Sequence, residues 1–162
     1  MSLIRLEVPG SLDYRDLAVR VVAAACKLVS SHSGAVGDDE AKNDFDNQVV
    51  SAFGEAFNNA AIHAYKNRPI GIIELEIEIG TGDITLRIAD HGQSFDPTQI
   101  KEPDLDALPE SGLGLFIIRS FMDTVRYHPG APNVLSMTKH FAAEDSLLNG
   151  AGTASPPTGG TP

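Results

Sequence analysis

Hydrophobic and polar residues alternate most regularly in the middle of the chain. Residues 73–79 read Ile-Glu-Leu-Glu-Ile-Glu-Ile, and residues 84–88 resume the alternation after the turn Gly80-Thr81-Gly82-Asp83. A period of two predicts strands, and the glycine-rich turn predicts that they form a hairpin. One face of this hairpin is apolar and the other is polar, which is typical of an antiparallel sheet covered by helices on one side.

Two segments have apolar residues at helical spacing. A short strand over residues 3–8 stops at Pro9-Gly10, and Ser11 or Asp13 could then cap a helix that runs to about Ser30. A second helix is predicted within residues 40–65. The stripe of the first helix is Leu17, Val21, Ala24 and Leu28, and that of the second is Val49, Phe53, Phe57, Ala60 and Ala64.

The rest of the pattern completes a two-layer domain. A third helix is predicted from about Gly112 to Met122, followed by a hairpin of residues 125–127 with 134–137. Residues 91–111 are irregular and contain three prolines, as expected of a functional lid. We therefore expect an α/β two-layer sandwich of the α+β class, in which about three helices cover one face of a largely antiparallel sheet.

Length and composition favour one domain over residues 1–143. Residues 144–162 are rich in Gly, Pro, Ser and Thr, and we expect this tail to be disordered. The 22 acidic residues outnumber 12 basic ones, so the surface should repel nucleic acid. No stretch is apolar enough to span a membrane, which predicts a cytoplasmic protein. The single cysteine, Cys26, lies in an apolar helical run and is expected to be a buried core thiol.

Three clusters of residues could carry chemistry, and the first is on the second helix. Glu55 and Asn59 lie one turn apart and away from the apolar stripe, so both should face the same space. An amide oxygen can bind Mg²⁺, and a carboxylate can orient and deprotonate a hydroxyl group. Taken alone, the pair could equally be part of a solvated helix face. His63 continues this face and is interpreted as a rim residue.

The second cluster, Asp90-His91-Gly92, ends the strand that contains residues 84–88. Counting by two places Asp90 on the apolar face, where an unpaired carboxylate is costly. An adenine amine could be its partner, and Gly92 would allow a flat base to approach the backbone. The alternative is an Asx turn that only closes the strand.

The third cluster is Gly112-Leu113-Gly114, at the start of the third helix. Backbone N–H groups at a helix N-terminus can bind phosphate oxygens. The alternative is a glycine-rich turn that only allows tight entry into the helix. The P-loop and protein-kinase signatures are missing from the sequence.

The order of the three clusters resembles the N, G1 and G2 boxes of the GHKL ATPases, over about residues 45–127. The details are similar to the bacterial anti-sigma-factor serine kinases: Glu55-Ala56-x-x-Asn59 with His63-Ala64-Tyr65, then Asp90-x-Gly92, then Gly112-Leu113-Gly114-Leu115. The resemblance implies the Bergerat, or histidine-kinase-like, ATP-binding fold, with a mixed, largely antiparallel sheet.

The resemblance also implies roles for individual residues. Glu55 would be the general base for a serine hydroxyl, Asn59 the Mg²⁺ ligand and Asp90 the residue that reads adenine. Gly92, Gly112, Leu113 and Gly114 would shape the nucleotide pocket. ATP would phosphorylate a serine of a STAS-type anti-anti-sigma protein, and the chain would hold a sigma factor inactive and could form a homodimer.

One departure and two alternatives qualify this expectation. Many relatives have a glycine where this chain has Glu110, whose carboxylate could repel a triphosphate. A nucleotide-gated binding module without phosphotransfer is the first alternative, although pure binding needs no base such as Glu55. A histidine-kinase catalytic module is the second, and the short segment before the first helix argues against it.

Overall fold

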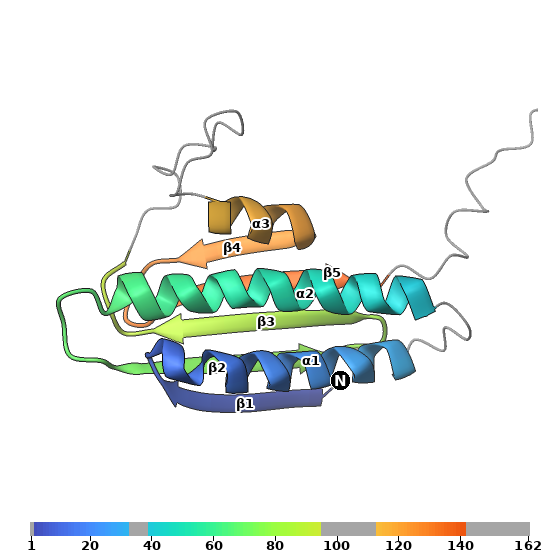
Figure 1. Ribbon diagram of the computed structural model, residues 1–162, viewed down its shortest axis with the longest axis horizontal. Coiled ribbons are helices and arrows are strands. Elements are labelled where there is room, and N and C mark those ends of the chain that lie inside the picture. The colour runs from blue at the N-terminus through green and yellow to red at the C-terminus, as the bar shows by residue number, and fades with distance from the viewer. Residues whose placement is uncertain (1, 33–38, 95–112, 142–162) are drawn as a thin grey trace, which may run out of the picture.

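The predicted hairpin is the centre of a five-stranded sheet in the computed structural model, which describes residues 2–32, 39–94 and 113–141. The strand order is β1-β2-β3-β5-β4, and each of the four pairings is antiparallel (Figure 1). The largely antiparallel sheet is thus confirmed. The strands are β1 (Ser2–Pro9), β2 (Ile72–Ile79), β3 (Asp83–Asp90), β4 (Thr124–His128) and β5 (Asn133–His140).

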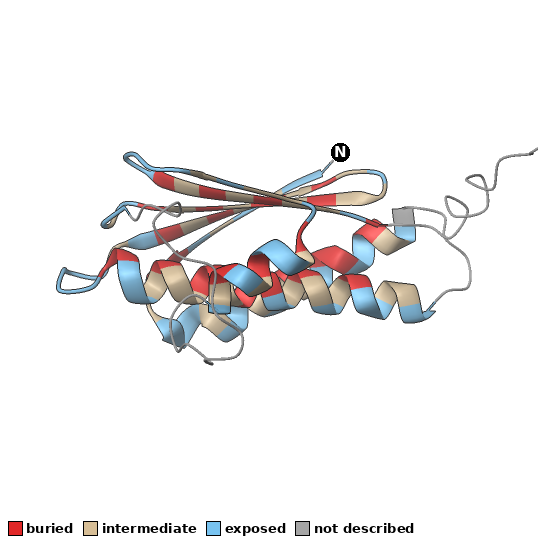
Figure 2. Cartoon of the chain, turned by 90° about the horizontal axis from the view of Figure 1, so that it is seen from above, coloured by how far each residue is buried: buried red, intermediate tan, exposed pale blue. Residues whose placement is uncertain are grey.

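Three α-helices form the second layer, on one face of the sheet (Figure 2). α2 lies in the middle and packs against both α1 and α3. A π-helical turn, η2 (Ala60–Ala64), directly follows α2. A short 3-10 helix, η1 (Leu12–Tyr14), leads into α1. The α-helices are α1 (Arg15–His32), α2 (Asp39–Asn59) and α3 (Leu113–Phe121).

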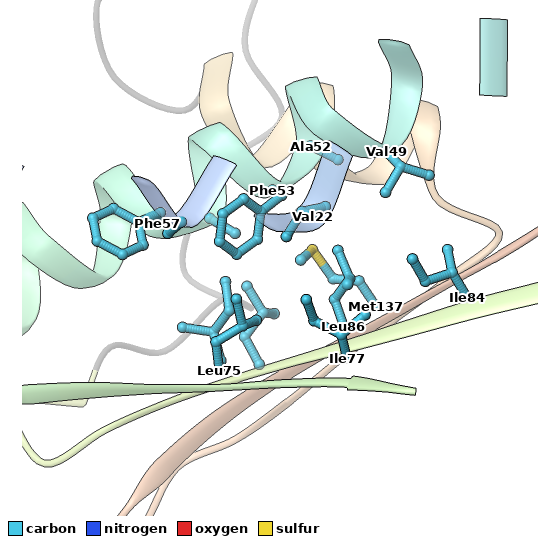
Figure 3. Packing of buried hydrophobic residues seen from close by; sticks show 14 of the residues in the cluster. Val22, Val49, Ala52, Phe53, Phe57, Leu75, Ile77, Ile84, Leu86 and Met137 are labelled. Carbon is cyan, nitrogen blue, oxygen red and sulfur yellow. The ribbon is translucent and has the colours of Figure 1, made fainter. Parts of the chain in front are cut away.

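The core lies between the helices and the apolar face of the sheet. Phe53 and Phe57 of α2 point toward Leu75, Ile77 and neighbouring strand residues, as Figure 3 shows. All five residues of the predicted stripe on the second helix are buried, which confirms that prediction. Burying such side chains contributes roughly 1.5 to 3 kcal/mol each.

The predicted stripe of the first helix is wrong at three of its four positions, and only Val21 is half-buried and packs against the core. Leu17 and Leu28 are 49% and 44% exposed, and Ala24 is exposed too. The buried face of α1 is turned by about one residue, because small side chains allow the helix to approach both α2 and the sheet closely. This buried face consists of Ala18, Val22, Ala25, Cys26 and Val29. Cys26 is fully buried, as expected, and its burial raises the pKa of the thiol from 9.0 to about 12.

Several predictions fall outside the described residues. These are the tail from residue 144 onward, most of the irregular segment 91–111, Glu110 and Gly112. The domain boundary at residue 143 therefore remains a prediction. Within the described ranges, no helix combines the length and the hydrophobicity that crossing a membrane requires.

Candidate functional site

The C-terminal half of α2 carries two polar residues that face α3. Glu55 and Asn59 are both half-buried, one turn apart. A Cβ atom placed on Gly114, the second residue of α3, would lie 2.9 Å from Glu55 Oε2 and 3.7 Å from Asn59 Oδ1. The structure therefore brings Glu55, Asn59 and Gly114 together, and a side chain at position 114 would crowd the end of the Glu55 side chain.

The start of α3 provides backbone donors beside these side chains. The helix begins at Leu113, whose side chain is exposed. The first N–H groups of a helix lack intrahelical acceptors, and they lie at its positive end. Leu113 and Gly114 are thus placed where an anion could be bound.

Asp90 lies at the end of β3, on the buried face of the sheet, and is 8% exposed. Its Oδ1 accepts a hydrogen bond of 2.9 Å from the backbone N–H of Gly92. The Asx turn that was the alternative interpretation is therefore present. The turn is compatible with a ligand at Asp90 as well, because a carboxylate can accept several hydrogen bonds.

Gly92 packs directly against the π-helical turn that follows α2. A Cβ atom on Gly92 would overlap the backbone carbonyl of Ala64, and the N–H of Gln93 donates to that same carbonyl oxygen at 2.8 Å. Asn59 directly precedes η2, and Ala64 is the last residue of that turn. The strand-end pair Asp90 and Gly92 is thereby attached to the same end of α2 that carries Glu55 and Asn59 (Figure 1).

Asn133, the first residue of β5, was missed in the sequence. It is opposite Asp90 in the β3–β5 register and is fully buried. Its Nδ2 donates to Asp90 Oδ1 at 3.0 Å and to the backbone oxygen of Gly92 at 3.3 Å. The signal that could have found it is the pairing of the second hairpin with β3, which places these two polar residues side by side.

Tyr65 links the start of β2 to the turn that follows β3. Its hydroxyl donates to the backbone oxygen of Ile72 at 2.6 Å and accepts a hydrogen bond of 3.3 Å from the His91 N–H. Its ring lies against Gly10 and Gly71, where a Cβ atom would collide with it. Burial raises the pKa of Tyr65 above its ordinary value of 10.0. His63 is exposed in η2, consistent with a rim residue.

A metal ion at this site would have to share its coordination shell with a ligand. In the part of the chain that the structure describes, His, Cys, Asp and Glu form no group of three that could hold a metal. Mg²⁺ in phosphate chemistry commonly takes only one or two protein ligands and completes its shell with phosphate oxygens and water. Asn59 suits such a site, because its side chain makes no capping hydrogen bond to η2.

Comparisons with known proteins identify the family of this chain. The serine-protein kinase RsbW of Staphylococcus aureus strain JH9 is 36% identical over 158 residues, which cover 92% of this chain and 93% of the relative, and the strain Newman protein matches equally. The structure of the RsbU and RsbW domains of Rv1364c from Mycobacterium tuberculosis matches 86% of this chain and 32% of that chain, with 17% identity and a TM-score of 0.53. The family model of the histidine kinase-like ATPase domain matches residues 15–139. The chain therefore belongs to the histidine kinase-like ATPase domain family and is a homologue of the serine-protein kinase RsbW.

Proposed function

We propose that this chain is an ATP-dependent protein serine kinase and anti-sigma factor. The observation that supports it most directly is the proximity of Gly114 to both Glu55 and Asn59, near the η2 turn against which Gly92, two residues after Asp90, packs. A carboxylate, a free amide and a helix N-terminus in one place suit a triphosphate and an attacking hydroxyl group. The homology to a serine-protein kinase supports the same reaction.

The base of ATP would bind at the Asp90 end of the site. The carboxylate would accept a hydrogen bond from the exocyclic amine of adenine, and Gly92 would leave the base free to approach the turn. The triphosphate would extend toward α3, where backbone N–H groups at Leu113 and Gly114 would contact its oxygens. Gly112 would also belong to this phosphate-binding part of the pocket.

Asn59 would hold Mg²⁺ through its amide oxygen. The ion would offset the negative charge of the phosphates when bound. Asn59 is half-buried and lies beside Gly114, the second residue of α3, so its amide oxygen would be near the expected path of the triphosphate.

Glu55 would be the general base. In the transfer step, the serine oxygen of the partner forms a bond to the γ-phosphorus, and the bond between this phosphorus and the ADP oxygen breaks. The serine proton passes to the Glu55 carboxylate, and ADP leaves with the bonding electron pair. Catalysis then depends mainly on orientation and on electrostatic stabilisation, because the site supplies no covalent intermediate.

The partners would be those of the kinase family that the chain resembles. A STAS-type anti-anti-sigma protein would supply the serine, and a sigma factor would be bound while that protein is phosphorylated. The net charge of −10 argues against direct binding to nucleic acid. A homodimer is compatible with this function.

A phosphotransfer assay tests the proposal. The chain is incubated with Mg-ATP and a STAS-type protein from the same genome, and serine phosphorylation is followed by mass spectrometry. Wild type should phosphorylate one serine, while Glu55→Gln should bind nucleotide normally and transfer at least about a hundredfold more slowly. Glu40→Gln, on the first turn of the same helix, is the matched control.

Two outcomes would contradict the proposal in different ways. If Glu55→Gln transfers at the wild-type rate, Glu55 is not the base. If nucleotide binds tightly but every tested partner stays unmodified, the chain is a nucleotide-gated binding module instead.

A further inference from the structure

Asn133 is a fully buried polar residue at the base-binding end of the site, and its amide orientation is fixed by its neighbours. The backbone N–H of Gly130 lies 3.1 Å from Asn133 Oδ1, and only an oxygen can accept this hydrogen bond. The amide nitrogen must therefore face Asp90 Oδ1 and the backbone oxygen of Gly92, which both accept. Turning the amide over would oppose donor to donor and acceptor to acceptor.

Both described hydrogen bonds to the Asp90 side chain end on the same oxygen. Oδ1 accepts from the Gly92 N–H at 2.9 Å and from Asn133 Nδ2 at 3.0 Å. Rotation of the carboxylate would break these two bonds in a buried place, where an unpaired polar group is costly. Asn133 thus holds the carboxylate in one orientation and leaves Oδ2 as the oxygen that a ligand can reach.

We propose that Asn133 is a positioning residue that makes the site select a purine with an amine at position 6 over one with an oxo group there. This inference rests on the proposed binding of the base at Asp90. The fixed carboxylate only accepts, so it is complementary to a 6-amine and repels a 6-oxygen. Both N–H bonds of the Asn133 amide are already donated, to Asp90 Oδ1 and to the Gly92 backbone oxygen, so the amide has no donor left for a 6-oxo group.

Comparing ATP with inosine triphosphate tests this selectivity, because the two differ in the group at position 6. The full chain is titrated with each magnesium nucleotide by calorimetry, for wild type and for Asn133→Leu. Removing the amide should reduce the preference for ATP over inosine triphosphate by at least about tenfold, mainly through weaker ATP binding. An unchanged preference, or an equal loss for both nucleotides, would overturn the inference.

Thr138→Val is the matched control for changes in β5. Thr138 lies five residues further along the strand and exchanges a hydrogen bond of 2.9 Å with Thr85. It should lower stability without changing the preference for ATP. If wild type itself binds neither nucleotide, the proposed function fails; if wild type prefers ATP and Asn133→Leu does too, only the role of Asn133 fails.

Asn133→Asp provides a test that does not depend on removing the side chain. When ionised, its carboxylate would face Asp90 and weaken ATP binding by at least about tenfold, and because the charge of Asp90 raises its pKa, this loss should grow as the pH rises. As the pH falls, a protonated Asp at this position can again donate to Asp90 Oδ1, so the ATP preference should recover toward wild type. Wild type is the reference at each pH, because the ionisable side chains of Tyr65, Glu74 and His91 lie around the turn that follows Asp90. An ATP preference that is full at every pH, or that does not recover as the pH falls, would overturn the role.

Discussion

The Glu55 carboxylate lies directly against Gly114, so that a Cβ atom on Gly114 would come within 2.9 Å of Oε2. The position of the Glu55 side chain, which we propose as the base, therefore depends on the absence of a side chain at Gly114. A side chain at position 114 must displace the carboxylate, while the backbone of neither helix has to move. This relationship separates an effect on catalysis from an effect on folding.

Gly114→Ala should lower phosphotransfer more than stability. The new methyl group displaces the flexible end of Glu55, and alanine has a higher helix propensity than glycine by about 1 kcal/mol. We expect a transfer rate at least about tenfold lower, with a free energy of unfolding equal to or above that of wild type. Urea unfolding and the kinase assay check the two parts. A transfer rate equal to that of wild type would contradict the proposed position of the base.

Gly92→Ala should affect both folding and binding. Its Cβ would overlap the Ala64 carbonyl, which is backbone and cannot move aside cheaply. We expect a loss of about 1 to 3 kcal/mol in the free energy of unfolding, together with weaker ATP binding. Gly82→Ala is the control: its φ of +94° also penalises alanine, but no atom lies near the new methyl group. Normal ATP binding by Gly92→Ala would argue against the base-binding turn.

Much of this architecture could be predicted from the sequence. The strict alternation in residues 73–79 and 84–88 reports a sheet with one buried face, and it also places Asp90 on that face. The aromatic stripe of α2 correctly predicts the buried side of that helix. It therefore also predicts that Glu55 and Asn59 lie away from that stripe.

The remaining features required the tertiary structure. On α1, the large residues Leu17 and Leu28 are exposed while small residues pack, so a search for large apolar side chains selects the wrong face. Asn133 follows a turn, so no alternation of apolar and polar residues leads up to it that could predict its burial. Its meaning arises only from the β3–β5 register, which is a contact between residues 43 positions apart.

Tyr65→Phe should destabilise the turn at the end of β3. Without the hydroxyl, the Ile72 carbonyl loses a donor and the His91 N–H loses an acceptor. We expect the free energy of unfolding to fall by about 1 to 3 kcal/mol. Tyr14→Phe, at an exposed tyrosine, is the control and should change it by less than about 0.5 kcal/mol. Equal effects of the two variants in urea unfolding would contradict the role of Tyr65.

Stability should fall in alkaline solution, in part because of Cys26. The folded protein keeps the thiol protonated up to about pH 12, whereas the unfolded chain releases the proton near pH 9. The contribution of Cys26 is therefore complete below pH 9 and is lost between pH 9 and about 12, at up to about 1.4 kcal/mol per pH unit. Tyr65 acts in the same direction above pH 10.

Cys26→Ala measures how much of the loss of stability at alkaline pH is due to the thiol. Urea unfolding of wild type and variant is compared at pH 7 and at several values between pH 9 and 11. The variant should be less stable at pH 7 because of the cavity, yet lose less free energy of unfolding as the pH rises. Parallel curves for the two proteins would show that Cys26 does not contribute to the alkaline loss.

The central claim is that side chains from α2 and the end of β3 serve one magnesium nucleotide. Calorimetric titration with Mg-ATP tests it, using wild type, Asn59→Ala and Asp90→Asn. We expect one nucleotide per chain for wild type and affinity at least about tenfold lower for each variant, with Asn59→Ala losing the dependence on Mg²⁺. Failure of wild type to bind Mg-ATP, or full affinity in Asp90→Asn, would contradict the account.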